Sequence, residues 1–245
     1  MNKINTPKNI TMRHEEKFIC SERQLFLLEN RLKTVCKPDS HQTGASYTIR
    51  SLYFDTVGDR FLEEGVQGVD NRSKFRIRIY NGADTMIRLE KKTSVGQLKC
   101  KDSCRLSRCD VEEILSGKTY SPLEAENKTL QEFRYLQMAE GLVPKIIVEY
   151  DRATYVSRTG DVRITFDRSI RASVLLKDFF AETLLTVPIL PDGKNVLEVK
   201  YSGVLPGYLA RLLDLGDLQR VSFSKYGLCR NIIENNGRIE DYYEF

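Results

Sequence analysis

The chain has 245 residues, of which 41% are hydrophobic and 29% charged, a composition typical of a globular protein rather than a disordered one. Its 38 basic and 34 acidic residues leave a net charge of only +4. This balance does not indicate a nucleic-acid-binding protein, so any anion site must come from a local arrangement of charge. No stretch approaches the roughly 18 apolar residues of a membrane span, and residues 1–9 lack the apolar centre of a secretion signal. We therefore expect one cytoplasmic domain over residues 1–245, with residues 1–9 flexible.

The cysteine content predicts no site. The six cysteines do not have the spacing of paired zinc ligands, and the chain has only two histidines, His14 and His41, that could assist. The cysteines are Cys20, Cys36, Cys100, Cys104, Cys109 and Cys229. Reduced thiols are typical of a cytosolic protein, and we assign these residues no function.

The first predicted elements are a strand and a helix. Residues 10–20 alternate in polarity, as expected of a strand with a side-chain period of two. One face of this strand carries three charged residues: Arg13, Glu15 and Lys17. Ser21 and Gln24 have the spacing of a capping box, which predicts a helix that extends to about Lys33.

A second strand and a short helix are predicted next. Residues 46–56 are rich in aromatic and β-branched side chains, which favour strands. Residues 57–65 predict a short helix that Gly65 would end.

An alternating hairpin follows. Residues 74–80 and 87–92 alternate between apolar and charged residues on either side of Asn81-Gly82, a strong short-range hairpin signal. The charged residues of the first run share one face: Lys74, Arg76 and Arg78. Those of the second run are also in phase with each other: Arg88, Glu90 and Lys92. A further extended stretch, residues 96–102, places two lysines on one face: Lys99 and Lys101.

The second half of the chain changes period and then returns to strands. Residues 110–141 have helical spacing and predict an insert of two helices outside a sheet, divided near residues 117–122. Strand patterns return in three stretches: residues 145–155, 162–167 and 195–202. Polar side chains share a face within these strands: Tyr150 with Arg152, Arg163 with Thr165 and Asp167, and Glu198 with Lys200. Residues 205–215 and 224–235 are helical in pattern, with Ser224 as a cap of the last helix.

About eight strands without a repeating strand–helix–strand pattern predict an antiparallel sheet, and closure into a barrel would remove its exposed edges. One face of nearly every strand is apolar, while the other carries Arg, Lys and Glu. Two arrangements satisfy this pattern: the charged face lies in solvent, or it lines the inside of a barrel whose apolar face packs against helices. Buried cations are costly without a partner, so the second arrangement predicts a polyanion ligand, most simply phosphate.

Eight short motifs occur in order along the chain: Arg13-x-Glu15-x-Lys17-Phe18, Ser51-Leu52-Tyr53-Phe54-Asp55, Lys74-Phe75-Arg76-x-Arg78, Glu90-Lys91-Lys92, Glu149-Tyr150-x-Arg152, Arg163-x-Thr165-x-Asp167, Glu198-x-Lys200 and Ser224-Lys225-Tyr226. Together these motifs resemble the VTC-type polyphosphate polymerase domain of the triphosphate tunnel (CYTH-like) group, in a stand-alone bacterial form. The resemblance extends over residues 10–230, nearly the whole chain.

This resemblance implies an α+β fold with a closed antiparallel eight-stranded β-barrel and helices packed outside it. The barrel would bind ATP and inorganic polyphosphate, with Mn²⁺ or Mg²⁺ as cofactor and no nucleic acid as partner. The resemblance assigns catalytic roles to Arg76, Arg78, Lys92 and Arg152. It assigns phosphate binding to Arg13, Lys17, Lys99, Tyr150, Arg163, Lys200, Ser224 and Lys225. Glu198 and Glu15 would bind the metal.

Two positions depart from the related families. Tunnel triphosphatases begin with Glu-x-Glu-x-Lys, and Arg13 occupies the position of the first acid, which favours polymerisation over hydrolysis. The eukaryotic polymerases carry a histidine two residues after the strand lysine, where this chain has Ser94. The inositol-phosphate-sensing SPX domain and the membrane helices of those relatives are not expected here, and a membrane partner that receives the product stays an open question.

The sequence therefore predicts an ATP-dependent polyphosphate polymerase. A tunnel triphosphatase that hydrolyses tripolyphosphate or nucleoside triphosphates is the first alternative. A polyphosphate- or nucleotide-binding protein without turnover is the second, and a β-rich domain whose charges simply face water is the third.

Overall fold

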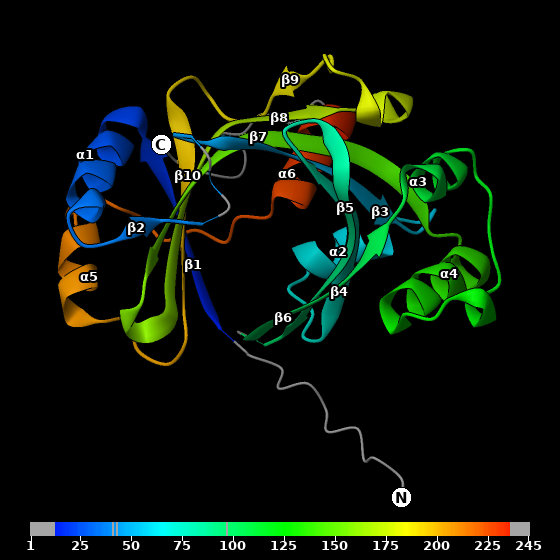
Figure 1. Cartoon of the computed structure of the whole chain (residues 1–245), viewed down its shortest axis with the longest axis horizontal. Coiled ribbons are helices and arrows are strands. Elements are labelled where there is room, and N and C mark those ends of the chain that lie inside the picture. The colour runs from blue at the N-terminus through cyan, green and yellow to red at the C-terminus, as the bar shows by residue number, and fades with distance from the viewer. Residues whose placement is uncertain (1–12, 41, 43, 97, 236–245) are drawn as a thin grey trace, which may run out of the picture.

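The computed structural model describes residues 13–40, 42, 44–96 and 98–235, as an antiparallel sheet flanked by helices (Figure 1). Residues 1–9, which the sequence predicts to be flexible, lie outside the described residues. So do residues 10–12, the first three of the predicted 10–20 strand. No helix in the described part of the chain is long and apolar enough to cross a membrane.

Eight long strands form one antiparallel path in the order β1-β10-β8-β7-β3-β4-β5-β6. Their bounds are β1 His14–Ser21, β3 Tyr47–Asp55, β4 Arg72–Tyr80, β5 Ala83–Val95, β6 Leu98–Leu106, β7 Val143–Ser157, β8 Val162–Ser173 and β10 Lys194–Tyr201. Two short strands pair beside this path: β2 Lys37–Pro38 with β7, and β9 Val187–Pro188 with β8. The α+β class and the antiparallel sheet predicted from the sequence are confirmed.

The two ends of the strand path, β1 and β6, approach each other at one point. Arg13 and Lys99 form an isolated antiparallel bridge, and the described residues of β1 and β6 make no continuous ladder beyond it. Farther along β1, the loop after α5 runs beside the strand, because Arg220 bridges to Phe18 and the Val221 N–H donates to the carbonyl of Lys17 at 2.8 Å. This loop therefore lies along β1 where the strand has no neighbouring strand on that side.

The helices confirm most of the predicted pattern. Their bounds are α1 Glu22–Lys33, α2 Arg60–Val66, α3 Arg108–Leu115, α4 Lys128–Glu140, α5 Gly207–Leu213 and α6 Lys225–Asn235, with three short 3-10 turns at η1 Pro122–Glu124, η2 Thr159–Asp161 and η3 Leu176–Phe180. Ser21 and Gln24 form the predicted capping box of α1. The predicted stop at Gly65 is wrong: Gly65 lies inside α2, and Gly68, with φ +69°, provides the left-handed conformation after the helix.

Helices cover the outer face of the sheet on two flanks (Figure 1). On one flank, α1 and α5 bury apolar residues against outward side chains of β8 and β10. These include Leu25, Leu28, Leu32 and Leu209 from the helices and Phe166 and Leu197 from the strands. On the other flank, Val111 of α3 and Phe133 of α4 pack against Phe75 and Leu89 of the central hairpin. Most of the charged strand faces are turned inward, away from these helices. Strand β3 is an exception, because it turns Tyr47, Ile49 and Tyr53 inward, and its Arg50 forms a buried ion pair with Glu149 of β7 on the outer side.

The last helix, α6, packs on the inner side of the sheet. Tyr226 and Cys229 of this helix share a buried cluster with Ile146 and Val148 of β7. Part of the inner face is therefore apolar and covered by α6, in contrast to a lining that is charged throughout. The remainder of the inner face surrounds a cavity.

Candidate functional site

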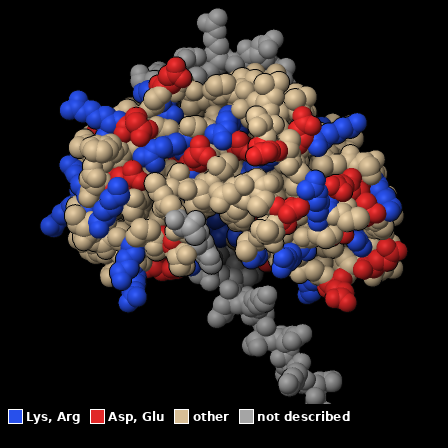
Figure 2. Space-filling view, turned by 45° about the horizontal axis from the view of Figure 1, so that its top comes forward, with Lys and Arg blue, Asp and Glu red and all other residues tan. Residues whose placement is uncertain are grey.

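A cavity of about 720 Å³ lies inside the sheet. Each of the eight long strands contributes to its lining, and the loop after α5 with the start of α6 completes it. Among the described residues, the lining contains thirteen Lys or Arg side chains and three Asp or Glu side chains. On the outer surface, by contrast, Figure 2 shows acidic and basic side chains interspersed over the face in view. The local excess of positive charge is therefore inside the molecule.

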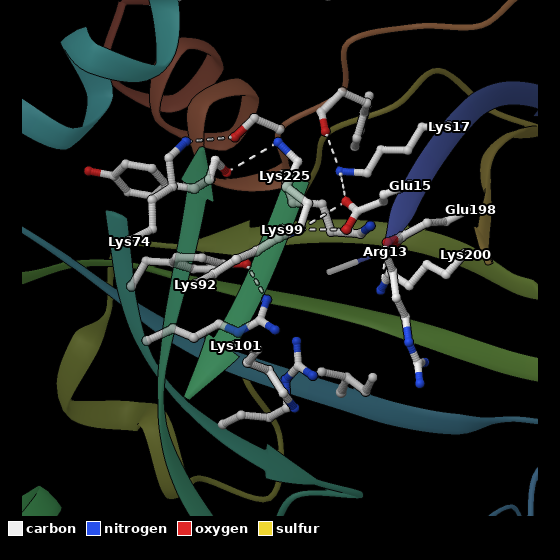
Figure 3. A pocket seen from close by; sticks show the side chains of 18 of the residues that line it. Arg13, Glu15, Lys17, Lys74, Lys92, Lys99, Lys101, Glu198, Lys200 and Lys225 are labelled. Atoms are coloured by element: carbon white, nitrogen blue, oxygen red, sulfur yellow. Dashed lines mark hydrogen bonds and ion pairs between the residues drawn. The ribbon is translucent and has the colours of Figure 1, made fainter. Parts of the chain in front are cut away.

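All the residues to which the resemblance assigned a role line this one cavity. They are Arg13, Glu15, Lys17, Arg76, Arg78, Lys92, Lys99, Tyr150, Arg152, Arg163, Glu198, Lys200, Ser224 and Lys225. Arg13 directly precedes β1, and the others come from seven of the long strands and from α6 with its N-cap; Figure 3 shows many of them directed toward a common space. Strand alternation and the resemblance together thus located the cavity.

The centre of the cavity is an arginine pair held by a buried carboxylate. Glu90 has only 1% of its side chain exposed and accepts hydrogen bonds from Arg76 Nε at 2.8 Å and Lys101 Nζ at 3.0 Å. Arg78 Nη1 lies 3.6 Å from the same carboxylate. Burial raises the pKa of Glu90, but the charges of Arg78, Arg76 and Lys101 outweigh it and hold the pKa well below its ordinary value. Glu90 is thus an ionised anchor beneath the lining.

A second buried carboxylate holds the neighbouring wall. Asp167 accepts two hydrogen bonds from Arg152, at 2.6 and 2.7 Å, and lies 2.6 Å from Lys225 Nζ. Burial opposes ionisation, but these two cations lower the pKa of Asp167. Tyr150 lies beside this group, and despite its burial the charges of Arg152 and Arg78 lower the pKa of its hydroxyl. Planar guanidinium groups fixed in this way are suited to bidentate contacts with phosphate.

The next part of the lining, on β1 and on β10 beside β8, pairs lysines with two glutamates (Figure 3). Lys92 Nζ lies 2.8 Å from Glu15, Lys17 Nζ lies 3.0 Å from Glu15, and Lys200 Nζ lies 2.7 Å from Glu198. Burial and Glu198 raise the pKa of Glu15, but the lysines lower it to about 2. Burial, together with Lys17 and Lys200, outweighs the attraction of Glu15 and lowers the pKa of Lys92 to about 7. In this part of the lining, three lysines are therefore paired with only two glutamates.

Glu15 and Glu198 are also the carboxylates that could hold a divalent metal. In the β1–β10 ladder, Glu15 is opposite Lys200 and Glu198 is opposite Lys17, so the two carboxylates are diagonal neighbours on one face. Both are ionised, because the surrounding cations lower their pKa values. No cluster of three or more His, Cys, Asp or Glu residues suited to a metal occurs in the described chain. The pair fits the way Mg²⁺ is bound by one or two carboxylates together with substrate phosphates.

Two predicted residues lie at the margin of the cavity and have partners outside it. Arg13 Nη2 lies 2.6 Å from Asp161, and its side chain is 37% exposed. Arg163 Nη1 lies 2.8 Å from Asp39. These cations can therefore act on a ligand only where it reaches the end of the cavity.

The sequence reasoning did not assign a role to several further lining residues. Lys74 donates to Ser224 Oγ at 3.1 Å, and burial, followed by the charges of Arg72 and Lys17, lowers the pKa of Lys74 to about 8. Lys101 and Arg72 also line the cavity. All three share a strand face with residues that were assigned a role. Arg72 and Lys74 lie on the same face as Arg76, and Lys101 lies on the same face as Lys99. The strand period alone could have found them.

The fold is that of the triphosphate tunnel (CYTH) proteins. A protein from Hippeastrum, described as a proposed adenylyl cyclase with a dominant triphosphatase activity, is 15% identical and superposes with a TM-score of 0.53 over 90% of this chain and 95% of its own. A proposed adenylate cyclase from Bacillus halodurans is 15% identical, with a TM-score of 0.52 over 87% of this chain and 94% of its own. No curated protein sequence matches the chain.

Comparison with protein-family models assigns the chain to a particular family. The model of the VTC domain matches residues 12–233. The chain belongs to the VTC domain family, as its motifs indicated.

Proposed function

We propose that this protein is a divalent-metal-dependent polyphosphate polymerase that transfers the γ-phosphate of ATP to a growing inorganic polyphosphate chain. The observation that carries the proposal is the cavity itself, in which thirteen cationic side chains of the described residues face three carboxylates. Membership of the VTC family supports phosphate chemistry at this site. A chain of linked phosphates is a ligand with enough charge to balance such a lining.

The central arginines would hold the transferred phosphoryl group. Arg76 and Arg78 are fixed by Glu90, and Arg152 is fixed by Asp167, so their positive charge is oriented before substrate arrives. Preorganised charge of this kind stabilises the transition state of phosphoryl transfer without rearrangement during the reaction. Lys92 would complete the group from β5, the strand that pairs with β4.

In the transfer step, a terminal phosphate oxygen of the acceptor chain forms a new bond to the γ-phosphorus of ATP. The bond between that phosphorus and the β,γ-bridging oxygen breaks, and ADP leaves with its electron pair. The acceptor oxygen is already anionic, so no general base has to remove a proton. Lys17, Lys99, Lys200 and Lys225 would bind the acceptor chain, with Tyr150 and Ser224 as hydroxyl contacts and Arg13 and Arg163 at the margin.

Glu198 and Glu15 would hold Mn²⁺ or Mg²⁺. The ion, when bound, neutralises charge on phosphate oxygens. These two glutamates are the carboxylates of the cavity that β1 and β10 place side by side.

Hydrolysis in the same cavity is the second candidate function, and the position of Arg13 argues against it. Where tunnel triphosphatases are expected to carry an acid, this chain carries a cation that lies beside Lys99 at the end of the cavity. A cation there favours a long anionic acceptor over a second metal ion.

The test is to incubate purified protein with ATP and Mn²⁺ and to resolve the products on a gel that separates long polyphosphate from orthophosphate. A ladder of chains, with one ADP for each phosphate transferred, is expected. Orthophosphate alone would assign the protein to the hydrolases. Tight tripolyphosphate binding without turnover would leave a binding protein and remove the catalytic roles.

A further inference from the structure

One part of the cavity lining is apolar, although the ligand of the proposed function is a chain of phosphates. Tyr47, at the start of β3, and Tyr80, at the end of β4, line the cavity together with Ile49. Ile49 is paired with Tyr80 in the β3–β4 ladder, so these residues lie at the same end of the hairpin. An inorganic polyphosphate has no apolar surface that could use this patch.

The two tyrosines also differ from the other Tyr and Phe residues of the lining. Tyr53, Tyr150, Tyr226 and Phe223 each have a Lys or Arg over the ring, at 4.9 to 5.7 Å from the centroid. Among the described residues, Tyr47 and Tyr80 have no such cation and lie against each other, with ring centroids 6.2 Å apart. Both are half-buried. Their rings can therefore accept another planar group.

These rings stand next to the proposed phosphate-binding arginines. Tyr47 is the register partner of Arg152 on β7, and Tyr80 follows Arg78 by two residues on β4. Two residues along a strand correspond to about 6.6 Å, which is within reach of a nucleoside attached to a bound triphosphate. The Tyr47 hydroxyl is 3.2 Å from Thr154 Oγ1, and this contact fixes the ring at the edge of the cavity.

We propose that Tyr47 and Tyr80 form the nucleobase subsite of the cavity. This inference rests on the proposed function, because it assigns a place to the nucleoside of the phosphate donor. Stacking on an aromatic ring accepts any base, since every base has a π-face. The donor then enters at the Tyr47–Tyr80 end, and the phosphate chain extends toward the end formed by Lys17, Lys74 and Ser224.

The experiment measures the dissociation constants of ATP and of tripolyphosphate by calorimetry, in one buffer, for the wild type and for Tyr47→Ala/Tyr80→Ala. ATP affinity is expected to fall about tenfold, as expected for loss of a stacking contact, while tripolyphosphate affinity changes by less than about twofold. Tyr47→Phe and Tyr80→Phe keep the rings and should retain ATP affinity. If the alanine variant does not fold, Tyr47→Leu/Tyr80→Leu retains apolar bulk without a π-face and is compared in the same way.

Equal loss of affinity for both ligands would overturn the inference, because the rings would then only support the cavity. Unchanged ATP affinity in a folded ring-less variant would also overturn it. Failure of the wild type to bind tripolyphosphate is a separate result that contradicts the proposed function itself. Binding of tripolyphosphate but not of ATP by the wild type would contradict the nucleobase subsite alone.

Discussion

Glu90 determines which edge of Arg76 is available to a ligand. A guanidinium group has five N–H donors, and Glu90 accepts from Nε at 2.8 Å and lies 2.7 Å from Nη2. Nη1 donates to the Tyr53 hydroxyl at 2.9 Å. Glu90 thus engages the Nε–Nη2 edge of the guanidinium, and the donors on its terminal nitrogens that remain would bind phosphate.

Glu90→Gln is therefore expected to lower kcat for polyphosphate synthesis by about 10²-fold, because the arginines lose their fixed orientation. The dissociation constant of tripolyphosphate should stay equal or fall, since the cavity gains one net positive charge. The measurements are steady-state kinetics and calorimetry on the same preparation.

Glu132→Gln is the matched control for this change. Glu132 pairs with Lys91, the neighbour of Glu90 on β5, but on the helix-covered side, and its side chain is 43% exposed. It should leave both kcat and affinity unchanged. A weakened affinity with normal kcat in Glu90→Gln would contradict the positioning role of Glu90.

Lys92 makes anion binding depend on pH. Its pKa of about 7 means that much of this side chain is neutral at pH 8 in the free protein, and a bound polyanion favours the protonated form. Tripolyphosphate binding at pH 8 is expected to take up protons, and its affinity should fall as pH rises from 6 to 9. Calorimetry in two buffers of different ionisation enthalpy measures the uptake, and an enthalpy independent of buffer would refute it. Lys92→Met should reduce the number of protons taken up.

The same pKa also affects stability, with the opposite pH dependence. The pKa of Lys92 is lower in the folded protein, at about 7, than its ordinary value of 10.5, so between these values the unfolded chain binds more protons. The contribution of Lys92 to stability is therefore lost as pH falls from 10.5 toward 7 and recovered as pH rises again toward 10.5. Without ligand, Lys92→Met should flatten the rise in unfolding temperature between these pH values.

At the scale of the elements, Asp55 connects β3 to two helices. Asp59, the N-cap of α2, makes no side-chain cap, and Asp55 takes that role by accepting from the N–H groups of Phe61 and Leu62 at 2.8 and 2.9 Å. It also accepts from the Tyr226 hydroxyl of α6 at 2.6 Å. Asp55 thus fixes α2 and α6 relative to the strand that carries Tyr53.

Asp55→Ala is expected to lower the free energy of unfolding by about 3 kcal/mol, because buried donors in two helices lose a charged acceptor. Chemical denaturation measures this loss. Ser107→Ala removes an exposed cap of α3, far from α6, and should cost only about 1 kcal/mol. Equal losses in the two variants would show that Asp55 acts as an ordinary cap.

The central hairpin illustrates what the sequence could predict and what it could not. Alternation placed Arg76, Arg78 and Lys92 on the charged faces of their strands without deciding whether those faces lie inside or in solvent, and Asn81-Gly82 marked the turn. A two-residue turn with regular pairing would set Arg78 opposite Thr85, an even-numbered residue against an odd-numbered one. The structure instead shifts register between Arg78 and Tyr80, so Arg76 is opposite Glu90. This shift in register brings Glu90, which fixes the two arginines, opposite Arg76. No residue pattern in the sequence predicts the shift.

Long-range packing was also beyond sequence reasoning. The pattern of α6 predicted a helix but not that it would cover the inner face of β7, where Tyr226 stacks on Tyr53 at 5.3 Å between ring centroids. The pairing of Arg152 with Asp167 joins β7 to β8 by register, and in the sequence both residues appeared only as members of alternating runs. The strand period predicts which side chains share a face. Which carboxylate pairs with which cation depends on the register between strands, which the sequence does not give.

At the scale of the whole molecule, the fold concentrates positive charge inside while the net charge is only +4. The buried carboxylates Glu90, Asp167, Glu15 and Glu198 offset part of this charge, and like-charge repulsion between the remaining cations opposes folding. The lowered pKa values of Lys74, Lys92 and Lys101 show that repulsion and burial act together there. A polyanion in the cavity should therefore stabilise the entire fold.

Tripolyphosphate at about 100 times its dissociation constant should add about 2.7 kcal/mol to the stability of the protein. For a chain of this size, that corresponds to a rise in unfolding temperature of about 5 to 10 °C, measurable by thermal denaturation followed by circular dichroism. Arg78→Met removes one buried cation of the cavity and should reduce the rise, whereas Arg108→Ala, at an exposed position on α3, should leave it unchanged. If both variants showed the full rise, tripolyphosphate would be acting on the outer surface, and the cavity would lose its assignment as the polyanion site.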